Sequence, residues 1–400
     1  MEVGIFYLPS IGNKAELSAG MAGRRTDLYQ RMLADLAEQA RYLDEHGYYG
    51  VAFTEHHFHI EGEEVSTNPI MLDLFIGMQT RNLRVGQLGI VLPCQNPIRV
   101  AEDVAMLDQM TRGRAFAGFA RGYQPRWVNT LGQHYQGLAD NATDPVAYEQ
   151  LKKELYEEHY EIIIKAWTNP TFSHQGKHWQ IPPKNIFWPA HEVTRAYGRG
   201  VDNQGIIQEV GIVPEPYQKP YPPLFQPFSF STASMRWAAQ RNIVPVSIVG
   251  DTDICANLFR ATQAGAAQAG KTLQFGQGVG MTREIVVADT DEEALAIGRE
   301  SGCFIWNKFF EPFGFNAALA RHGEDPKTIP NTFEAMCERG LTICGSPDTV
   351  SRKLERLFKD LPCEYFWVFF YTELIPQKAA MRSLELLTTK VFPRVMDKIR

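Results

Sequence analysis

Apolar, strand-like runs alternate with amphipathic, helix-like stretches along most of the chain. Short apolar runs predict β-strands at 3–8, 50–54, 85–92, 114–120, 224–228, 244–249, 278–287 and 365–370. Apolar positions three to four residues apart predict helices at 27–46, 69–80, 98–110, 147–167, 234–241, 253–268, from about 291, and at 376–391. Eight strand–helix pairs in this order predict an α/β fold, the (β/α)8 TIM barrel with its parallel sheet.

The alternation stops between residues 169 and 223. This stretch is rich in Pro, Gly and aromatic residues, as in Pro182-Pro183 and Pro220-Tyr221-Pro222-Pro223. It is too long for an ordinary connection, so we expect an insertion after the fourth strand–helix pair that packs over the barrel. Residues 1–400 are then expected to form a single barrel domain that carries this insertion.

Reactive side chains follow two of the predicted strands. The second strand leads into Glu55-His56-His57-Phe58-His59, and the fourth strand ends at Arg121. Residues just past the carboxyl ends of parallel barrel strands face the end of the barrel where ligands bind. We therefore expect an acid, imidazoles and a guanidinium group to converge on one site.

The histidines after the second strand allow three interpretations. His57 and His59 have the H-x-H spacing of metal-dependent barrel hydrolases, but that motif follows the first strand there, and no later strand end offers a further His-and-Asp set. The side chains could also be packed or solvated without a role. We favour a functional imidazole pair, because histidine titrates near neutrality and can donate or accept a proton.

Two further strand ends are candidate phosphate sites. Arg121-Gly122-Tyr123 combines a guanidinium group with backbone N–H groups, which suit an anion such as phosphate, and an ordinary surface ion pair is the less favoured alternative. Phe230-Ser231-Thr232-Ala233-Ser234 places hydroxyl groups at the start of a predicted helix. A helix N-terminus of this kind binds phosphate, and plain helix capping is the alternative.

An aromatic segment lies near the end of the chain. Six aromatic or proline residues fall within the ten positions from Trp306 to Phe315. The segment either lines a hydrophobic substrate pocket or packs as core at a helix end, and the sequence does not distinguish these possibilities.

Composition narrows the classes of partner. The net charge is −6, with both signs scattered along the chain, which argues against a nucleic-acid partner. No stretch approaches the roughly 18 apolar residues of a membrane span, and no leader-like segment precedes the first strand, so we expect a cytoplasmic protein without a membrane partner. The six cysteines include no C-x-x-C pair and are expected to be reduced thiols.

Longer motifs resemble the bacterial luciferase-like flavin monooxygenases. The resemblance rests on Glu55-His56-His57-Phe58, on residues 86–93, 97–104, 107–114 and 118–122, on Gly345-Ser346-Pro347, and on Val391-Phe392-Pro393-Arg394. It covers nearly the whole chain except 169–223. It implies a barrel that binds reduced FMN at its C-terminal mouth and lets the flavin react with O2.

The resemblance also implies roles for individual residues. His56 matches the catalytic histidine of the family, which stabilises the oxygenated flavin or transfers a proton. Leu88 and Gly89 match a pair whose non-proline cis peptide bond supports the flavin ring. The matches to phosphate-binding positions are Arg121, the backbone of Tyr123, Ser231 and Ser234, and a further family arginine would fall near Lys153.

One residue departs from the family pattern and redirects the expected substrate. Ala120 stands where the family has a reactive cysteine, which argues against a light-emitting aldehyde oxidase. We expect instead the oxygenation of a small, hydrophobic organic substrate, such as a terpenoid, alkyl or aromatic compound. The aromatic residues of the insertion and of residues 304–315 favour an apolar substrate.

The resemblance and the motifs together predict the partners. No Rossmann G-x-G-x-x-G follows a predicted strand, so reduced FMN is expected from a separate flavin reductase, in a two-component system. O2 is the second substrate, and a homodimer is expected because relatives pair through their early helices. The alternatives are a deazaflavin-dependent dehydrogenase on the same barrel, a flavin-binding protein without turnover, and a metal-dependent hydrolase.

Overall fold

The chain forms two compact units. A computed structural model describes residues 1–139 and 144–399. Unit 1 consists of Met1–Gly89 and Leu224–Arg400, and unit 2 consists of Ile90–Pro223. Unit 2 is thus one continuous segment placed between the two halves of unit 1 along the chain.

Parallel strands form the centre of unit 1. They are β1 (Glu2–Leu8), β2 (Gly50–Phe53), β3 (Arg84–Gln87), β8 (Leu224–Gln226), β9 (Val244–Ser247), β10 (Gly280–Val287) and β12 (Tyr365–Tyr371). They pair in the order β3-β2-β1-β12-β10-β9-β8, and a short strand, β11 (Thr342–Gly345), pairs with the second half of β10. Their residues are almost all buried, as expected of a parallel sheet covered on both faces.

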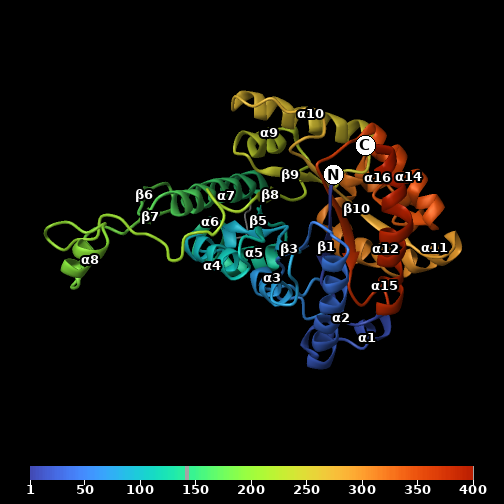
Figure 1. The fold of residues 1–400 in the computed structure, drawn as a ribbon, viewed down its shortest axis with the longest axis horizontal. Helices are drawn as coiled ribbons and strands as arrows, with labels where there is room; N and C mark the ends of the chain where they lie inside the picture. The colour runs from blue at the N-terminus through green and yellow to red at the C-terminus, as the bar shows by residue number, and fades with distance from the viewer. Residues whose placement is uncertain (140–143, 400) are drawn as a thin grey trace. The chain divides into compact units, whose positions relative to one another are not determined.

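Helices surround these strands in unit 1 (Figure 1). They are α1 (Lys14–Ser18), α2 (Thr26–Glu45), α3 (Pro69–Gly77), α9 (Thr232–Gln240), α10 (Thr252–Gln268), α11 (Asp291–Glu300), α12 (Gly302–Ile305), α13 (Phe333–Glu338), α14 (Pro347–Asp360), α15 (Gln377–Leu386) and α16 (Phe392–Ile399). Two π-helical turns, Trp306–Phe310 and Leu387–Val391, continue α12 and α15. None of the helices among the described residues is long and apolar enough to cross a membrane.

Aromatic side chains fill the space enclosed by the unit 1 strands. Phe6 of β1 and Phe369 of β12 pack edge to face with ring centroids 5.1 Å apart. One layer below, the Trp367 indole lies so close to Gly4 that a Cβ atom there would come within 2.4 Å of the ring. Glycine at position 4 is therefore what lets an indole fill this layer.

Unit 2 contains one further parallel strand and its helices. Strand β5 (Ala115–Ala120) pairs with the short β4 (Ile90–Val91). The helices are α4 (Pro97–Met110), α5 (Pro125–Leu131), α6 (Gln136–Ala139), α7 (Pro145–Thr168) and α8 (His191–Tyr197). Val91, Trp127, Val128 and Leu155 are among the fully or nearly buried residues of its core.

The strands and helices confirm the predicted fold class. With β5 as the eighth parallel strand, the chain has the strand–helix pairs of a (β/α)8 barrel. The stretch at 169–223 differs, since it contains only the hairpin of β6 (His174–Gln175) and β7 (Gln180–Ile181) and the short α8. Figure 1 shows α8 at the end of a long excursion beyond this hairpin. From 183 to 215, Gly205 is the one buried residue, and the expected place of this segment over the barrel stays a prediction.

Some element boundaries differ from the sequence prediction. The strand expected at 85–92 is divided in the structure into two strands. Strand β3 ends at Gln87, Leu88 and Gly89 belong to neither strand, and β4 is followed by a 3-10 turn at Leu92–Cys94. Strand β11 and helix α14 were not predicted. Residues 84–87 pair with β2, whereas residues 90–91 pair with β5. The single apolar run of the sequence therefore forms two strands with different neighbours.

Candidate active site

A buried imidazole–carboxylate pair follows β2. The loop after β2 folds back so that the His56 N–H donates to Ser66 O at 2.9 Å and the Val65 N–H donates to Pro9 O at 2.7 Å. This places His56 Nε2 3.2 Å from Glu64 Oε2. His56 is 5 % exposed and Glu64 is fully buried. The sequence analysis identified His56 and missed Glu64, which sits in an acidic run that looks solvated.

The three histidines of this loop have different partners. His57 Nε2 lies 2.9 Å from Glu55 Oε1, and His59 Nδ1 lies 2.8 Å from the backbone oxygen of Glu63. Within residues 1–139 and 144–399, no group of three or more His, Cys, Asp or Glu side chains is arranged to hold a metal ion. The loop thus holds two acid–imidazole pairs, His56 with Glu64 and His57 with Glu55.

Burial sets the protonation state of His56. Loss of solvent lowers its pKa well below 6.5, and the neighbouring His59 and His57 lower it further. His56 is therefore a neutral imidazole at neutral pH. A neutral imidazole beside a carboxyl group can accept a proton and return it, as a general acid–base does.

The end of β3 lies beside β2 in unit 1. The Leu88 N–H donates to Phe53 O at 2.9 Å, next to the start of the histidine loop. The peptide bond between Leu88 and Gly89 is cis, as the family resemblance predicted. Behind it, the Gln87 side-chain amide donates to the carboxyl group of Asp73 on α3. The cofactor-binding role of Leu88 and Gly89 stays a prediction.

The N-terminus of α9 carries the two predicted serines. Ser231 is the N-cap, and its Oγ accepts from the Ser234 N–H at 3.2 Å, so the capping alternative is realised for this side chain. The Gln226 amide donates to Ser234 Oγ at 2.6 Å. Ser231 is exposed and Ser234 half-buried. The first N–H groups of α9 are thus at the surface, where they suit an anion.

Unit 2 carries the remaining predicted residues, Arg121 and Tyr123, just past β5. Arg121 is exposed and makes no hydrogen bond or ion pair with any residue that the structure describes, so the surface ion pair considered for it is not seen. The Tyr123 hydroxyl accepts from the Gln124 amide at 3.1 Å. Five predicted residues, His56, Leu88, Gly89, Ser231 and Ser234, belong to unit 1.

A buried lysine lies beside Arg121. Lys152 of α7 is 3 % exposed, donates to Gly122 O at 3.2 Å and pairs with Glu149 at 2.6 Å. Burial lowers its pKa, and the charge of Arg121 lowers it further. Lys153, the position expected for the family arginine, is instead half exposed and faces Glu157 at 3.8 Å. The helix register places Lys152, and not Lys153, at the end of β5.

The aromatic segment after α12 is mostly buried. Trp306 and Phe310 are each 1 % exposed, and Phe315 packs against Phe310 with ring centroids 5.1 Å apart. Phe309 lies 5.5 Å from the His59 ring, whereas Phe313 is exposed. The core interpretation is confirmed for Trp306, Phe310 and Phe315, and the substrate-pocket interpretation stays a prediction.

Comparison with known proteins identifies the family. The model of the luciferase-like monooxygenases matches residues 1–363. The chain therefore belongs to the luciferase-like monooxygenase family, as its motifs predicted, and the expected class of enzyme is confirmed. It is 27 % identical over 345 residues to 3,6-diketocamphane 1,6-monooxygenase of Pseudomonas putida. The aligned residues are 82 % of this chain and 84 % of that relative.

Solved structures share the fold over nearly the whole chain. One is the oxygenating constituent of 3,6-diketocamphane monooxygenase from the CAM plasmid of Pseudomonas putida, a type II Baeyer–Villiger monooxygenase in complex with FMN. It gives a TM-score of 0.74 at 23 % identity and covers 98 % of both chains. The monooxygenase RslO1 from Streptomyces bottropensis gives 0.71 at 17 % identity, with 98 % of this chain and 99 % of that chain covered. These likenesses confirm the barrel.

Proposed function

We propose that this protein uses reduced FMN and O2 to oxygenate a small, hydrophobic organic substrate, and that the substrate is a cyclic ketone. The observation that carries the proposal is the neutral, buried His56, 3.2 Å from Glu64 just past the end of β2, in a chain of the luciferase-like monooxygenase family. The similarity to a diketocamphane monooxygenase over most of both chains supports the ketone.

The residues of the candidate site fit FMN. Leu88 and Gly89 would support the flavin ring, and Arg121 and the backbone of Tyr123 would bind the phosphate together with Ser231 and Ser234 of the α9 N-terminus. Two observations support this assignment: Arg121 has no carboxylate partner among the described residues, and the first turn of α9 is exposed. Lys152 adds a second positive charge beside Arg121.

The bound reduced flavin supplies the electrons that activate O2, and the side chains of the protein control protons and water. His56, neutral and 3.2 Å from Glu64, accepts or donates the proton at an imidazole nitrogen. The buried rings of Trp306 and Phe310 provide an apolar wall in unit 1 that excludes water.

The same proposal includes the partners and the location. Reduced FMN comes from a separate flavin reductase, the protein is a homodimer, and it acts in the cytoplasm. Residues 1–400 form one barrel domain with the insertion at about 169–223. The absence of a G-x-G-x-x-G motif after a strand supports the separate reductase, because the chain then lacks its own dinucleotide fingerprint.

Labelled oxygen tests the proposal directly. The purified protein is mixed with FMN, NADH, a generic flavin reductase and a panel of cyclic ketones under 18O2. We expect one 18O atom in a lactone product and no product when the reductase is omitted. Turnover with a reduced deazaflavin in place of FMN, without incorporation of oxygen, would instead identify a dehydrogenase. Flavin binding without any product would identify a binding protein.

A further inference from the structure

An aromatic cluster lies at one end of the space enclosed by the unit 1 strands, and it consists of Phe6, Phe228, Phe310, Phe315 and Phe369. The Phe228 ring centroid lies 5.7 Å from that of Phe6 on β1 and 6.1 Å from that of Phe369 on β12. Phe228 comes two residues after β8, and in the sheet of unit 1 β9, β10 and β12 separate β8 from β1. Its ring therefore reaches across the enclosed space near the carboxyl ends of the strands, where barrels bind ligands.

The backbone on both sides of Phe228 is held in place. The Ser229 N–H donates to Val246 O of β9 at 3.1 Å, and the Gln226 side-chain amide donates to Ser229 Oγ at 2.9 Å. Phe228 has a φ of 50°, in the left-handed region that a residue with a side chain adopts only at a cost. Strained residues of this kind persist where the surrounding contacts require them, and they are frequent at ligand sites. The fold thus fixes the place of this ring in spite of local strain.

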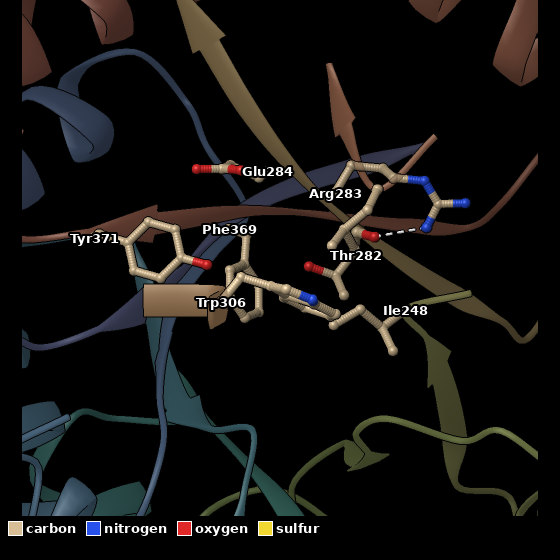
Figure 2. A pocket seen from close by; sticks show the side chains of 8 residues that line it. Ile248, Thr282, Arg283, Glu284, Trp306, Phe369 and Tyr371 are labelled. Atoms are coloured by element: carbon tan, nitrogen blue, oxygen red, sulfur yellow. Dashed lines mark hydrogen bonds between the residues drawn. The ribbon is translucent and has the colours of Figure 1, made fainter. Parts of the chain in front are cut away.

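Phe228 is the member of the aromatic cluster that a ligand can reach. Its side chain is half-buried, whereas the other four rings are only 1 % to 8 % exposed. Phe369 and the neighbouring Trp306 line a narrow pocket with Ile248 and Tyr371, and the described side chains leave no room there for a water molecule (Figure 2). A small molecule therefore cannot enter between the buried rings, and it meets the exposed edge of Phe228 instead.

The aromatic cluster adjoins both parts of the candidate site in unit 1. Phe309, in the π-helical turn that also carries one ring of the cluster, lies 5.5 Å from the His59 ring. The His59 ring in turn lies 5.6 Å from the His56 ring. Ser231, the N-cap of α9, follows Phe228 by three positions along the chain. A ligand that packs on Phe228 is therefore near the histidine loop and near the first turn of α9.

We propose that Phe228 is a specificity-determining residue, and that its half-buried ring is the surface against which the hydrocarbon ring of the ketone packs. This inference deepens the proposed function and rests on it. A phenyl ring offers apolar area and no hydrogen-bonding group, so it favours the carbon skeleton of the substrate over the carbonyl oxygen. Because its neighbours fix the ring in place, the volume of the ring limits the size of the ketone that fits.

Selectivity between two ketones tests the proposal. Phe228→Ala should raise kcat/KM for camphor, a bulky bicyclic ketone, relative to cyclohexanone by about 10-fold or more, because one apolar group in a pocket is worth about 10- to 200-fold. KM for cyclohexanone should rise with little change in kcat, since the lost contact does not involve the reacting atoms. Phe275→Ala is the matched control, because Phe275 is another half-buried phenylalanine of unit 1 and packs against Phe259 at 5.8 Å, outside the cluster. An unchanged ratio in Phe228→Ala would overturn the proposal.

Two further variants separate the ring from the backbone. Glycine adopts a φ of 50° without strain, so Phe228→Gly removes the ring and leaves the turn relaxed. It should shift the ratio of the two ketones as much as Phe228→Ala does. Phe228→Leu keeps most of the apolar volume and should shift the ratio less. A shift in Phe228→Ala that Phe228→Gly lacks would show that a displaced loop causes it, and would refute the role of the ring.

Binding without turnover separates this inference from the proposed function. Saturation-transfer NMR on the protein saturated with oxidised FMN measures Kd for cyclohexanone and for camphor, and Phe228→Ala should change their ratio in the same direction as kcat/KM. The affinities for FMN and for riboflavin should stay unchanged in this variant. Equal losses of both would assign the ring to the flavin and overturn the proposal. If the wild type binds the ketones and oxygenates neither, the proposed function fails, and the Kd ratio still decides the role of Phe228. A wild type that binds neither ketone would refute both.

Discussion

The chemistry of the site depends on how each residue is desolvated. His56 and Asp73 are both buried in unit 1, yet burial acts on them in opposite directions: it lowers the pKa of the imidazole and raises that of the carboxyl group. Both groups are thereby driven toward their neutral forms. A neutral base and a neutral acid can therefore coexist in one apolar interior.

His56→Ala should affect the reaction more than the fold. The side chain follows a strand end and touches Glu64, and the variant should lower product formation by about 10²–10⁴-fold. Reduced flavin should still be consumed, with hydrogen peroxide released in place of product. The ratio of product to NADH consumed measures this uncoupling. His57→Ala is the control and should uncouple much less, and full coupling in His56→Ala would place the chemistry elsewhere.

The charges at the end of β5 should set the affinity for FMN. Arg121→Ala removes a charge-assisted contact worth about 1.5–3 kcal/mol, which is an affinity loss of roughly 10- to 150-fold. Lys152→Met should also lower the affinity for FMN, because Lys152 lies beside Arg121. Isothermal titration with FMN and with riboflavin, which has no phosphate, measures both effects.

Two controls accompany these titrations. Lys153→Met should leave FMN affinity unchanged, since Lys153 is half exposed and faces Glu157. Riboflavin affinity should barely change in any of the variants. Equal weakening of FMN and riboflavin would mean that Arg121 and Lys152 are structural.

At the scale of elements, the end of β3 depends on a polar pair behind it. The Asp73 carboxyl of α3 accepts from the Gln87 amide and from the Gly86 N–H, and burial raises its pKa well above the ordinary value. Asp73 Oδ1 and Gln87 Oε1 have no hydrogen-bond partner among the described residues. We predict that Asp73 is protonated, since a neutral acid leaves a smaller buried charge and its O–H is a donor that Gln87 Oε1 could accept.

This pair predicts a pH-dependent stability. The folded pKa of Asp73 lies above the unfolded value, so its contribution is complete below the unfolded pKa and is lost as the pH rises through the folded pKa. Asp73→Asn resembles the neutral acid and should flatten that alkaline loss in denaturant titrations. Asp73→Leu should cost about 1–3 kcal/mol at all pH values, because it leaves the Gln87 amide unsatisfied. Identical pH curves for wild type and Asp73→Asn would exclude the protonated pair.

The sequence predicted the elements well where a local pattern determines them. Helix α2 and strand β12 lie within one residue of their expected bounds, because the periodicity of α2 and the apolar run of β12 are local signals. Strand β11 was missed because it has only four residues, and these form a strand only by pairing with β10. Glu64 was missed for the same reason, since its burial depends on the fold-back of its loop onto Pro9. The family position near Lys153 stays a prediction. The sequence could not tell that Lys152 is the buried lysine there, because adjacent positions of a helix lie on different faces.

At the scale of the whole molecule, an exposed apolar face supports a dimer. Met71 of α3 and Met78, the residue that caps its C-terminus, are 69 % and 70 % exposed, and residues seven positions apart share a helix face. Sedimentation at micromolar concentration should show twice the mass of one chain. Met71→Glu/Met78→Glu should give monomers, whereas Val146→Glu at the exposed start of α7 should not. A wild-type monomer throughout this range would refute the dimer.

The pairing of β1 with β12 has a consequence for how the protein is made. The register runs from Glu2 opposite Tyr365 to Leu8 opposite Tyr371, and beyond it the Ser10 N–H donates to Thr372 Oγ1, 362 residues away. A ribosome adding about 5–20 residues per second needs roughly 20 to 70 s to cover that interval. The nascent chain therefore keeps an apolar strand edge open for most of its synthesis, and a chaperone that shields this edge until the last strand emerges would keep it from pairing with other chains.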